Sequence, residues 1–427
     1  MFDYLGDAKK VLLIEPPFYS LFGYKRWHYP MTLTLVGTYL EELGHEVKIL
    51  DLDFPRPEYQ EYNRNEARNN YYLYREALNN KEHIVWKKVE QALIEYEPDI
   101  LGLTSITPKI DSANLIAQMA KKMYGNKIKV LLGGAHVNGM HIMNPDHDFG
   151  EYYDSIIHNI PALINRKPNK KLLTEYDQYP MNDFFSVMTL MGCPNSCTFC
   201  CNSFEKKIIY RELDTIREEL IELNEINEKY HENFPVYIVD DCFFSNSKRF
   251  NDIAGIIHNL GMNFKAGSRI MALTASKIDD FVKYGGIKLY IGVESGSQRV
   301  LDRINKKIQV SEIIKRTRML NDKGIDWSAF FIVGFPFETL EDLKKTKELI
   351  EIIQPAFVSL NRFTPYPGTA IYKEFYADTN LEFNQLFQLN KNNGIKLNDE
   401  IEEYIEHLFE YADTYNENKA KLRYIIE

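Results

Sequence analysis

MGCPNSCTFCCN, residues 191–202, carries four of the five cysteines in the chain. Cys193, Cys197 and Cys200 have the spacing C-x3-C-x2-C, directly after the apolar run SVMTLM. Cysteine thiolates are ligands for zinc and for iron–sulfur clusters. A structural zinc ion takes four ligands, and the further nearby thiol, Cys201, adjoins Cys200, which makes joint ligation of one ion awkward. Three cysteines on one loop can hold a four-iron cluster with one iron left open, so the spacing favours a reactive cluster over zinc.

Length and composition limit the classes of protein to which the chain can belong. With 427 residues, 44% of them hydrophobic, it is too long for one ordinary core, and two domains with an appendage are expected. No apolar run approaches the roughly 18 residues of a membrane span, and the start MFDYLGDAKK is not a signal peptide, so a cytoplasmic protein is expected. The net charge of -10 argues against a nucleic-acid partner. The clustering of the cysteines also argues against a disulfide framework.

Ahead of the cysteines, apolar runs alternate with helical patterns. Strands are expected at residues 9–14, 45–50, 98–105 and 128–134, with helices at 31–43 and 111–123. This alternation predicts an α/β domain with a doubly wound, Rossmann-like parallel sheet over residues 1–160. The polar, tyrosine-rich stretch 54–97 is interpreted as a solvated helical insertion.

The alternation resumes after about Asn182, now with six strands. The expected strands are SVMTLM, VYIVD, NFKAGS, KLYIGV, SAFFIV and AFVSLN, each followed by a helical segment. Six such units predict a partial (β/α)6, TIM-like barrel over residues 183–375, with its reactive end at the carboxyl ends of the strands. The acidic, aromatic tail 376–427 is predicted to be a helical extension on the barrel's flank, with closure of the barrel mouth as the alternative.

The cysteine motif and the barrel pattern together resemble the radical S-adenosylmethionine superfamily. C-x3-C-x-F-C, which includes Phe199, follows the first predicted barrel strand, as in that family. The resemblance implies that Cys193, Cys197 and Cys200 hold a [4Fe-4S] cluster whose open iron binds the amino and carboxylate groups of S-adenosyl-L-methionine. An electron from the cluster then cleaves this cofactor to a 5′-deoxyadenosyl radical.

Polar residues after three further strands extend the resemblance. VDDCFF after the second strand implies that Asp241, or its neighbour Asp240, receives the methionine ammonium. GSRI places Arg269 after the third strand, where its guanidinium can pair with the cofactor carboxylate. IGVESGS places Glu294 after the fourth, for the ribose hydroxyls or the ammonium. One acid after a strand is more often a helix cap, but several polar groups at one barrel end favour ligands.

The fifth and sixth strands complete the similarity, which covers about residues 184–375. FIVGFPFET resembles the family's G-x-P-G-E-T turn near adenine, with Gly334 as its first glycine. Phe337 stands where the second glycine is usual, and this departure leaves the local backbone contact open. LNRFTPYPGTAIY ends the sixth strand in the family's manner. Cys201 and Cys242 are interpreted as packed thiols.

The amino-terminal pattern resembles the cobalamin-binding domain of cobalamin-dependent radical S-adenosylmethionine enzymes. The matching segments are YPMTLTLVGTYLEELGHEVKILDLD, EPDILGLTSITPKIDSANLIAQMAKK and KVLLGGAHV. The resemblance implies that small residues after the third and fourth strands let the nucleotide tail of cobalamin approach the backbone: Thr104, Ser105, Gly133 and Gly134. The D-x-H-x-x-G motif that supplies a histidine to cobalt in other cobalamin proteins is absent, as in much of this class. His136 is interpreted as a loop residue.

The cysteine count excludes one related family. Methylthiotransferases pair a similar barrel with an amino-terminal domain that holds its own cluster through cysteines. No cysteine precedes Cys193 in this chain, so a second cluster there would lack thiolate ligands.

These resemblances predict a cobalamin-dependent radical enzyme, in the leading hypothesis a C-methyltransferase acting on an unactivated carbon of a small-molecule or natural-product substrate. The first alternative is a cyclase, ring-contracting or rearranging enzyme without methyl transfer, and the second is a non-catalytic cobalamin or redox sensor. The expected partners are the substrate and an external electron donor such as flavodoxin or ferredoxin. Trp27, His28 and Tyr29, on the first loop at the sheet's carboxyl edge, either face the cavity or pack on the surface.

Overall fold

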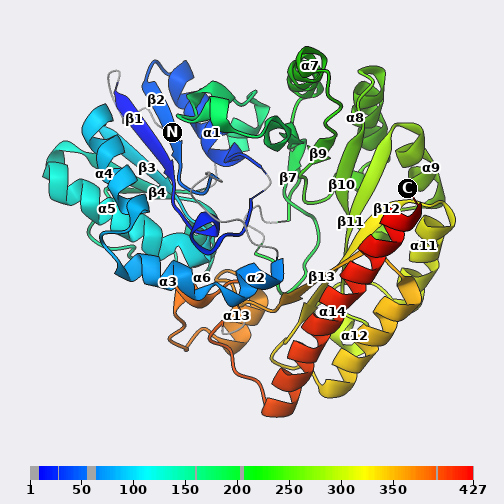
Figure 1. The fold of residues 1–427 in the computed structure, drawn as a ribbon. Helices are drawn as coiled ribbons and strands as arrows, with labels where there is room; N and C mark the ends of the chain where they lie inside the picture. The colour runs from blue at the N-terminus through cyan, green and yellow to red at the C-terminus, as the bar shows by residue number, and fades with distance from the viewer. Residues whose placement is uncertain are drawn as a thin grey trace. The chain divides into compact units, whose positions relative to one another are not determined.

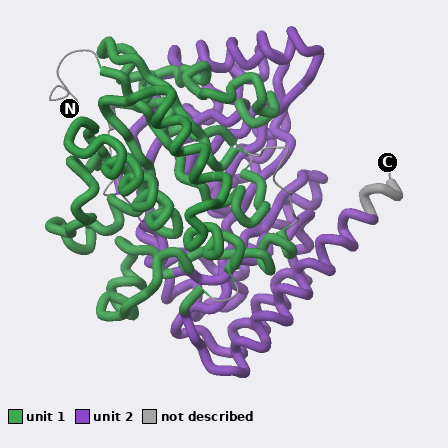
Figure 2. The backbone as a smooth tube through the Cα atoms, turned by 60° about the vertical axis from the view of Figure 1, so that its left-hand side comes forward, with its two compact units in different colours: residues 1–184, 365–394 green, residues 185–364, 395–427 purple. Residues whose placement is uncertain are grey.

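The computed structural model describes residues 9–26, 28–54, 64–158, 161–201, 206–390 and 393–426. The chain forms two compact units, residues 1–184 with 365–394 and residues 185–364 with 395–427 (Figure 2). Each unit is built on its own parallel sheet (Figure 1). Trp27, which the sequence places on the first loop, lies outside the described residues.

The sheet of the first unit has five parallel strands in the order β2-β1-β3-β4-β5. Their bounds are β1 Lys10–Glu15, β2 Glu46–Asp51, β3 Ile100–Thr104, β4 Lys129–Gly133 and β5 Ser155–Ile157. The four predicted strands are confirmed, and the strand order reverses between β1 and β3, as in a doubly wound sheet. The sequence did not reveal β5, because three half-buried residues are too few to give a strand pattern.

Helices cover both faces of this sheet. They are α1 Met31–Glu42, α2 Arg64–Asn69, α3 Tyr72–Asn79, α4 Ile84–Tyr96, α5 Ile110–Tyr124 and α6 Ala135–Met143. Successive side chains of a strand point to opposite faces, so Leu12 and Ile14 of β1 pack in one core with α4 and α5. Val11 and Leu13 pack in the other core with α1. With both faces covered, a ligand can reach this sheet only at its strand ends.

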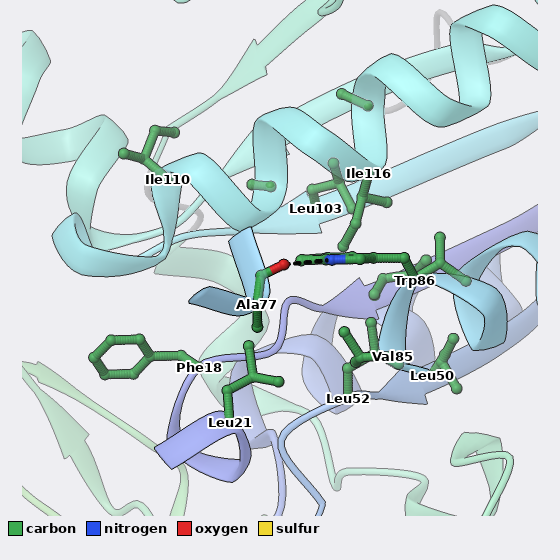
Figure 3. Close-up of a cluster of buried hydrophobic side chains, with 14 of the residues drawn as sticks. Phe18, Leu21, Leu50, Leu52, Ala77, Val85, Trp86, Leu103, Ile110 and Ile116 are labelled. Atoms are coloured by element: carbon green, nitrogen blue, oxygen red, sulfur yellow. Dashed lines mark hydrogen bonds between the residues drawn. The ribbon is translucent and has the colours of Figure 1, made fainter. Parts of the chain in front are cut away.

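The stretch 54–97 is not a solvated insertion, so this expectation is wrong. Its helix α4 leads into β3 and buries five side chains in the core: Val85, Trp86, Val89, Leu93 and Tyr96. The Trp86 indole Nε1 donates a hydrogen bond to the Ala77 carbonyl oxygen at 2.9 Å (Figure 3). The buried residues recur with helical spacing among charged ones and form an apolar stripe on one face of α4. The stretch is polar when all its residues are averaged, so this stripe is not apparent from its composition.

The second unit has a six-stranded parallel sheet in the order β13-β12-β11-β10-β9-β6, which confirms the predicted partial barrel. The strands are β6 Ser186–Val187, β9 Val236–Ile238, β10 Phe264–Arg269, β11 Gly286–Glu294, β12 Asp326–Val333 and β13 Phe357–Arg362. Its helices are α7 Leu213–Tyr230, α8 Ser247–Asn259, α9 Ala275–Lys283, α10 Gln298–Arg303, α11 Val310–Asp322 and α12 Leu340–Ile353. Because all six strands are parallel, their carboxyl ends lie at one edge, where β/α barrels place their sites.

The first predicted barrel strand, SVMTLM, is divided in two. Its first residues form β6, and its last form β7 Leu190–Met191, which pairs antiparallel with β8 Ile209–Tyr210. Between them, the N–H groups of Thr189 and Leu190 donate to Asp240 Oδ1 at 2.6 and 3.1 Å. A carboxylate after β9 thus takes the place of a strand partner, and the chain leaves the sheet just before the cysteines.

The tail is divided between the two units. Residues 365–394, with α13 Ala370–Phe375, belong to the first unit. There Phe387 is buried, with its ring 4.9 Å from that of Phe18. The remainder belongs to the second unit, so the tail is not a single helical body.

The last helix, α14 Asp399–Ile426, packs along β13 and α12. This is the flank packing that the sequence predicts. The Asn416 side-chain amide binds both polar groups of the Val358 backbone: Oδ1 accepts from the N–H at 2.8 Å, and Nδ2 donates to the carbonyl at 2.9 Å. Since β13 is the outermost strand, α14 covers backbone groups that would otherwise form an open sheet edge.

Candidate functional site

The cysteine loop begins at Gly192, directly after β7. Gly192 has a φ of 87°, in the left-handed region that favours glycine, and its N–H donates to Asp241 Oδ2 at 2.9 Å. Beyond it, Cys193 is half-buried, Cys197 is buried and Cys200 is exposed. The structure therefore places the three predicted ligands on one loop beside the end of β9.

The segment that follows α10 holds this loop on both sides of Cys197. The Thr198 N–H donates to the Ile304 carbonyl at 3.0 Å, and the Asn305 side-chain amide donates to the Ser196 carbonyl at 2.8 Å. These two bonds fix the backbone around the buried thiol.

Hydrogen bonds between thiols lower the pKa values of two of them. The hydrogen bond from Cys242 lowers the pKa of Cys193 to about 5, although burial opposes this shift. The hydrogen bond from Cys200, with the positive charge of Lys306, lowers the pKa of Cys197 to about 6. The pKa of Cys200 is raised in turn, because its proton is the one shared with Cys197. Thiolates are the ligands of iron, so this environment fits the donor set of an iron–sulfur cluster.

The three thiols differ from the ligand set of a single metal ion. In the ranges that the structure describes, no three His, Cys, Asp or Glu side chains are placed to hold one ion. A [4Fe-4S] cluster takes each thiolate on a separate iron, so its ligands do not have to converge on one point.

The two acids after β9 have different surroundings. Asp240 is buried and accepts hydrogen bonds from the Thr189 N–H, the Thr189 hydroxyl and the Leu190 N–H. Burial raises its pKa to about 7. Asp241 is exposed and accepts from the Gly192 N–H through Oδ2. Asp240 therefore positions the chain, and Asp241 is the acid that can also meet a ligand.

Glu294 ends β11 with a backbone conformation that is unusual for its residue type. Its φ is 72°, and the pairing of β11 with β12 shifts register between Gly292 and Glu294. A left-handed conformation costs a residue with a side chain about 1–2 kcal/mol, and such strain is typical of functional sites. A Cβ on Gly292 would lie 2.5 Å from Glu294 Oε1, so the glycine leaves space for the carboxylate.

Lys306, which the sequence did not single out, joins Glu294 to the cysteine loop. Its Nζ binds Glu294 Oε1, and both side chains are buried. Arg269, the last residue of β10, donates through Nη2 to the Lys306 carbonyl and through Nη1 to Cys197 Sγ at 3.2 Å. Lys306 lies in the polar run RINKKI beside the exposed Lys307, so no sequence pattern distinguishes it from surface lysines.

The turn after β12 is organised by a buried acid. Gly334 has a φ of 88°, and Glu338 Oε2 accepts hydrogen bonds from the N–H groups of Gly334 at 2.6 Å and Phe335 at 3.2 Å. Burial raises the pKa of Glu338 to about 8. Phe337 does not have a positive φ, so the missing second glycine causes no strain in this turn.

Aromatic rings lie between this turn and the cysteine loop. The rings of Phe335 and Phe337 are stacked at 5.5 Å, and Phe199 lies 6.2 Å from Phe335. The Lys306 ammonium is 6.0 Å from the centre of the Phe199 ring. An apolar wall therefore adjoins the charged residues of this site.

In the first unit, the strand ends bring the four predicted residues together. Thr104 ends β3 and Gly133 ends β4, and the Ser105 N–H donates to the Gly133 carbonyl at 2.9 Å. Gly134 has a φ of 106°, and a Cβ there would lie 2.5 Å from the Ser105 carbonyl oxygen. A Cβ on Gly133 would lie 3.1 Å from the Ile157 carbonyl oxygen. The glycines thus allow the ends of β3, β4 and β5 to approach closely, and the contact of these residues with the nucleotide tail of cobalamin stays a prediction.

His136 is not a loop residue, so this interpretation is wrong. It belongs to α6, which begins directly after Gly134, and its side chain is buried. Its Nδ1 lies 3.3 Å from Thr107 Oγ1, and its ring is 4.9 Å from the Phe383 ring. His136 is a packed core histidine.

A cluster of buried charges lies at the ends of β1 and β2. It contains three acids and two cations: Glu15, Asp51, Asp53, Arg26 and Lys109. Lys109 Nζ binds Glu15 and Asp53, and Arg26 binds Asp51. Pairing offsets the cost of removing these charges from water. Lys109 lies in the polar run TPKID, which gives no sign of its burial.

The same cluster fixes the first loop of the sheet. Arg26 Nε donates to the His28 carbonyl at 2.9 Å. Tyr29 is buried, with its ring 5.8 Å from that of Phe184, whereas the His28 side chain is exposed. The sequence left open whether His28 and Tyr29 face a cavity or pack. In the structure Tyr29 is packed and His28 is accessible.

Comparison with known families matches both halves of this arrangement. Residues 187–350 match the radical SAM superfamily, and residues 24–152 match the B12 binding domain. The chain belongs to the cobalamin-dependent radical S-adenosylmethionine enzymes. The cofactors of this family are a [4Fe-4S] cluster, S-adenosyl-L-methionine and cobalamin, as predicted.

Relatives of this radical S-adenosylmethionine enzyme include a methyltransferase and a cyclase. An uncharacterized methyltransferase of Pyrococcus horikoshii is 28% identical over 70% of this chain and 73% of its own length. The anaerobic magnesium-protoporphyrin IX monomethyl ester cyclase of Rubrivivax gelatinosus is 23% identical over 67% of this chain and 60% of its own length. The match thus spans less than two thirds of the cyclase.

Solved cobalamin-dependent radical S-adenosylmethionine enzymes share the fold. OxsB with aqua-cobalamin and S-adenosylmethionine has a TM-score of 0.65 at 14% identity, over 92% of this chain and 66% of that one. TsrM from Kitasatospora setae, with cobalamin and a [4Fe-4S] cluster, has a TM-score of 0.59 at 13% identity, over 86% and 78%. Among the helices that the structure describes, none has the length and apolar character needed to cross a membrane.

Proposed function

We propose that this radical enzyme is a C-methyltransferase that adds a methyl group to an unactivated carbon of a small-molecule substrate. The observation that carries the proposal is a chain of contacts from the cysteine loop: Arg269 binds both Cys197 and the Lys306 carbonyl, and Lys306 binds Glu294. These residues place both signs of charge beside a cluster ligand, as a cofactor with an amino and a carboxylate group requires. The Pyrococcus relative favours methyl transfer as the outcome.

In this proposal Cys193, Cys197 and Cys200 hold the cluster and leave one iron for S-adenosylmethionine. Asp241 receives the methionine ammonium, because it is exposed whereas Asp240 is saturated with hydrogen bonds. The methionine carboxylate faces positive charge on the side of the cysteine loop where the Arg269 guanidinium lies.

Glu294 and Lys306 serve the ribose end of the same cofactor. The strained backbone of Glu294 and its pairing with Lys306 fix the carboxylate, so its second oxygen can accept from the ribose hydroxyls. Phe199 and the turn at Gly334 form the apolar side for adenine. Because these charges are buried, each contact is stronger than it would be in water.

The amino-terminal sheet holds cobalamin at its carboxyl edge in this proposal. Thr104, Ser105, Gly133 and Gly134 meet at the ends of β3 and β4, next to the point between β1 and β3 where the strand order reverses. Doubly wound sheets bind nucleotide-like groups at such a point. When bound, the cluster supplies the electron that cleaves S-adenosylmethionine, and cobalamin supplies the methyl group. The protein holds both cofactors and excludes water from them.

Isotope labelling tests methyl transfer. The protein is reconstituted anaerobically with iron, sulfide and hydroxocobalamin, and reductant and S-adenosylmethionine with a deuterated methyl group are added. We expect the label on the bound cobalamin, and on the product once a substrate is supplied. Reductive cleavage to 5′-deoxyadenosine with no labelled cobalamin would contradict a methyltransferase.

Cyclisation without methyl transfer is the second candidate. It is favoured by the similarity to the Rubrivivax cyclase, which extends over 67% of this chain. In that case, 5′-deoxyadenosine forms together with an unlabelled product. The same labelling experiment therefore separates the two candidates.

A further inference from the structure

Asp241 and Cys242, consecutive residues after β9, hold both polar groups of Gly192. The Gly192 N–H donates to Asp241 Oδ2 at 2.9 Å, and the Cys242 thiol donates to the Gly192 carbonyl at 3.3 Å. Gly192 directly precedes Cys193. The segment after β9 therefore sets the position of the first proposed cluster ligand.

The Cys242 sulfur also contacts the sulfur of Cys193. Their side chains are hydrogen bonded, and the Ser245 side chain forms a hydrogen bond to Cys242 as well. Cys242 is only 6% exposed. Its S–H proton thus has two acceptors close by, the Gly192 carbonyl and the Cys193 sulfur.

These contacts do not fit the interpretation of Cys242 as a packed thiol. A thiol that only fills space behaves as a small apolar group and has no directed polar contact. Cys242 is instead enclosed by polar groups: a carbonyl, a hydroxyl and another sulfur. An ionised sulfur is a stronger acceptor than a neutral carbonyl, so a cluster-bound Cys193 thiolate competes well for the proton.

We propose that Cys242 is a positioning residue for the iron–sulfur cluster, and that its S–H donates to the Cys193 thiolate and raises the cluster's reduction potential. Hydrogen bonds to ligating sulfurs are among the factors that set the potential of such clusters. They stabilise the reduced cluster more than the oxidised one, because the reduced cluster carries more negative charge. This inference rests on the ligand role that the proposed function gives to Cys193.

The experiment compares full-length wild type, Cys242→Ala and Cys242→Ser after anaerobic reconstitution. Cluster reduction is followed by electron paramagnetic resonance against a controlled potential. We expect Cys242→Ala to keep its iron and to show an about tenfold lower ratio of reduced to oxidised cluster at the wild-type midpoint, about 59 mV for one electron. Cys242→Ser keeps a donor and is expected to recover most of this loss. Cys201→Ala is the matched control, and its potential should equal that of wild type.

The outcomes separate this inference from the proposed function. An unchanged potential in Cys242→Ala with full iron content overturns the role of Cys242 and leaves the ligand set intact. If Cys242→Ala loses its cluster, the result for Cys242→Ser decides whether Cys242 acts as a donor. A cluster at the wild-type potential in Cys242→Ser supports the donor role, and loss of iron in both variants overturns it. Full iron content in Cys193→Ala would instead overturn the ligand assignment, and with it this inference.

Discussion

The carboxyl ends of the barrel strands and the carboxyl ends of the amino-terminal strands use buried lysines in opposite ways. Lys109, which follows β3 in the amino-terminal unit, binds two acids, within a cluster where three acids face two cations. Lys306 in the barrel binds one acid and lies beside a second cation, Arg269, which in turn donates to the Cys197 sulfur. The first set has one acid more than it has cations, and burial raises the pKa of Glu15, which favours the protonated form of that acid. The second is balanced only when negative groups such as thiolates or a carboxylate are included, which is the property of a binding site.

The two regions also differ in how a ligand would be held. The barrel site offers side-chain donor atoms: thiols, carboxylates and a guanidinium. The amino-terminal edge offers small residues whose backbones touch. A site built from donor atoms is visible in a sequence as residue types, whereas one built from backbone and shape is not.

Removal of any one proposed cluster ligand should abolish the cluster. Cys193→Ala, Cys197→Ala and Cys200→Ala are each expected to lose the roughly four irons per chain of a [4Fe-4S] cluster, together with its brown absorbance. Cys201→Ala, next to Cys200, should retain both. Iron analysis and visible spectra after anaerobic reconstitution measure the effect. Cluster loss in Cys201→Ala with retention in Cys193→Ala would show that the ligand set is wrong.

A bulky residue at the amino-terminal edge should remove cobalamin and spare the cluster. In Gly134→Val the new Cβ would lie 2.5 Å from the Ser105 carbonyl oxygen, in a backbone region that valine avoids. The ends of β3 and β4 must then move apart, and we expect loss of bound hydroxocobalamin with unchanged iron content. Gly44→Ala, where a Cβ meets nothing within 4 Å, is the control for strain without displacement. Full cobalamin retention in Gly134→Val would show that cobalamin does not bind at the ends of β3 and β4.

Loss of Lys109 should act on stability. Lys109→Met leaves buried acids unpaired, and breaking a buried pair costs about 3–5 kcal/mol of unfolding free energy. Urea unfolding of the cofactor-free chain measures it. Lys122→Met, at an exposed position of α5, the helix that begins directly after Lys109, should stay within about 0.5 kcal/mol of wild type. If Lys109→Met changes the free energy of unfolding only slightly, the charge cluster around Lys109 does not stabilise the fold.

Loss of Lys306 should instead act on ligand binding. Lys306→Met releases Glu294 from its partner, and we expect S-adenosylmethionine to bind more weakly by about 1.5–3 kcal/mol, roughly 10- to 150-fold. Calorimetry on the cluster-loaded protein measures the affinity, with iron content as the check on folding. Lys307→Met changes the exposed neighbour and should leave the affinity unchanged. Equal affinities in both variants would remove Lys306 from the site.

Glu338 should make the stability of the barrel depend on pH. Burial raises its pKa to about 8 from the ordinary 4.5. The folded chain then binds a proton that the unfolded chain has lost, so this stabilisation is present below about pH 4.5 and is lost as the pH rises through 8. Between these values the free energy of unfolding falls by at most about 1.4 kcal/mol per pH unit. Glu338→Gln should show a flatter profile between pH 5.5 and 8.5 in urea unfolding, and parallel profiles would contradict the shift.

The sequence predicted the strands of both sheets because their apolar runs are long and regularly spaced. It missed β5, whose three half-buried residues carry no pattern, and it mistook α4 for a solvated helix because an average polarity conceals a narrow apolar stripe. It also left Asp240 as an alternative to Asp241, since neighbours in a sequence share every pattern. Their separation depends on Thr189, which lies 51 residues earlier in the chain.

Lys306 shows the same limit at the site itself. Its neighbour Lys307 is chemically identical and exposed. The path of the chain after α10 brings the Lys306 ammonium, and not that of Lys307, to Glu294. The cysteines could be assigned from spacing because thiols are rare and grouped. Lysines are common in this chain, so the contacts of Lys306 could be found only from the structure.

The contact between Asn416 and Val358 allows the barrel to remain incomplete. A carboxamide carries the same two hydrogen-bonding groups as a peptide unit, so this one side chain imitates a missing seventh strand at one point of β13. An open sheet is thereby ended without closure into a ring, and without a free template on which a second molecule can add its own strand. Deleting the chain after about residue 410 would remove this side chain and expose the Val358 backbone groups at the outer edge of β13.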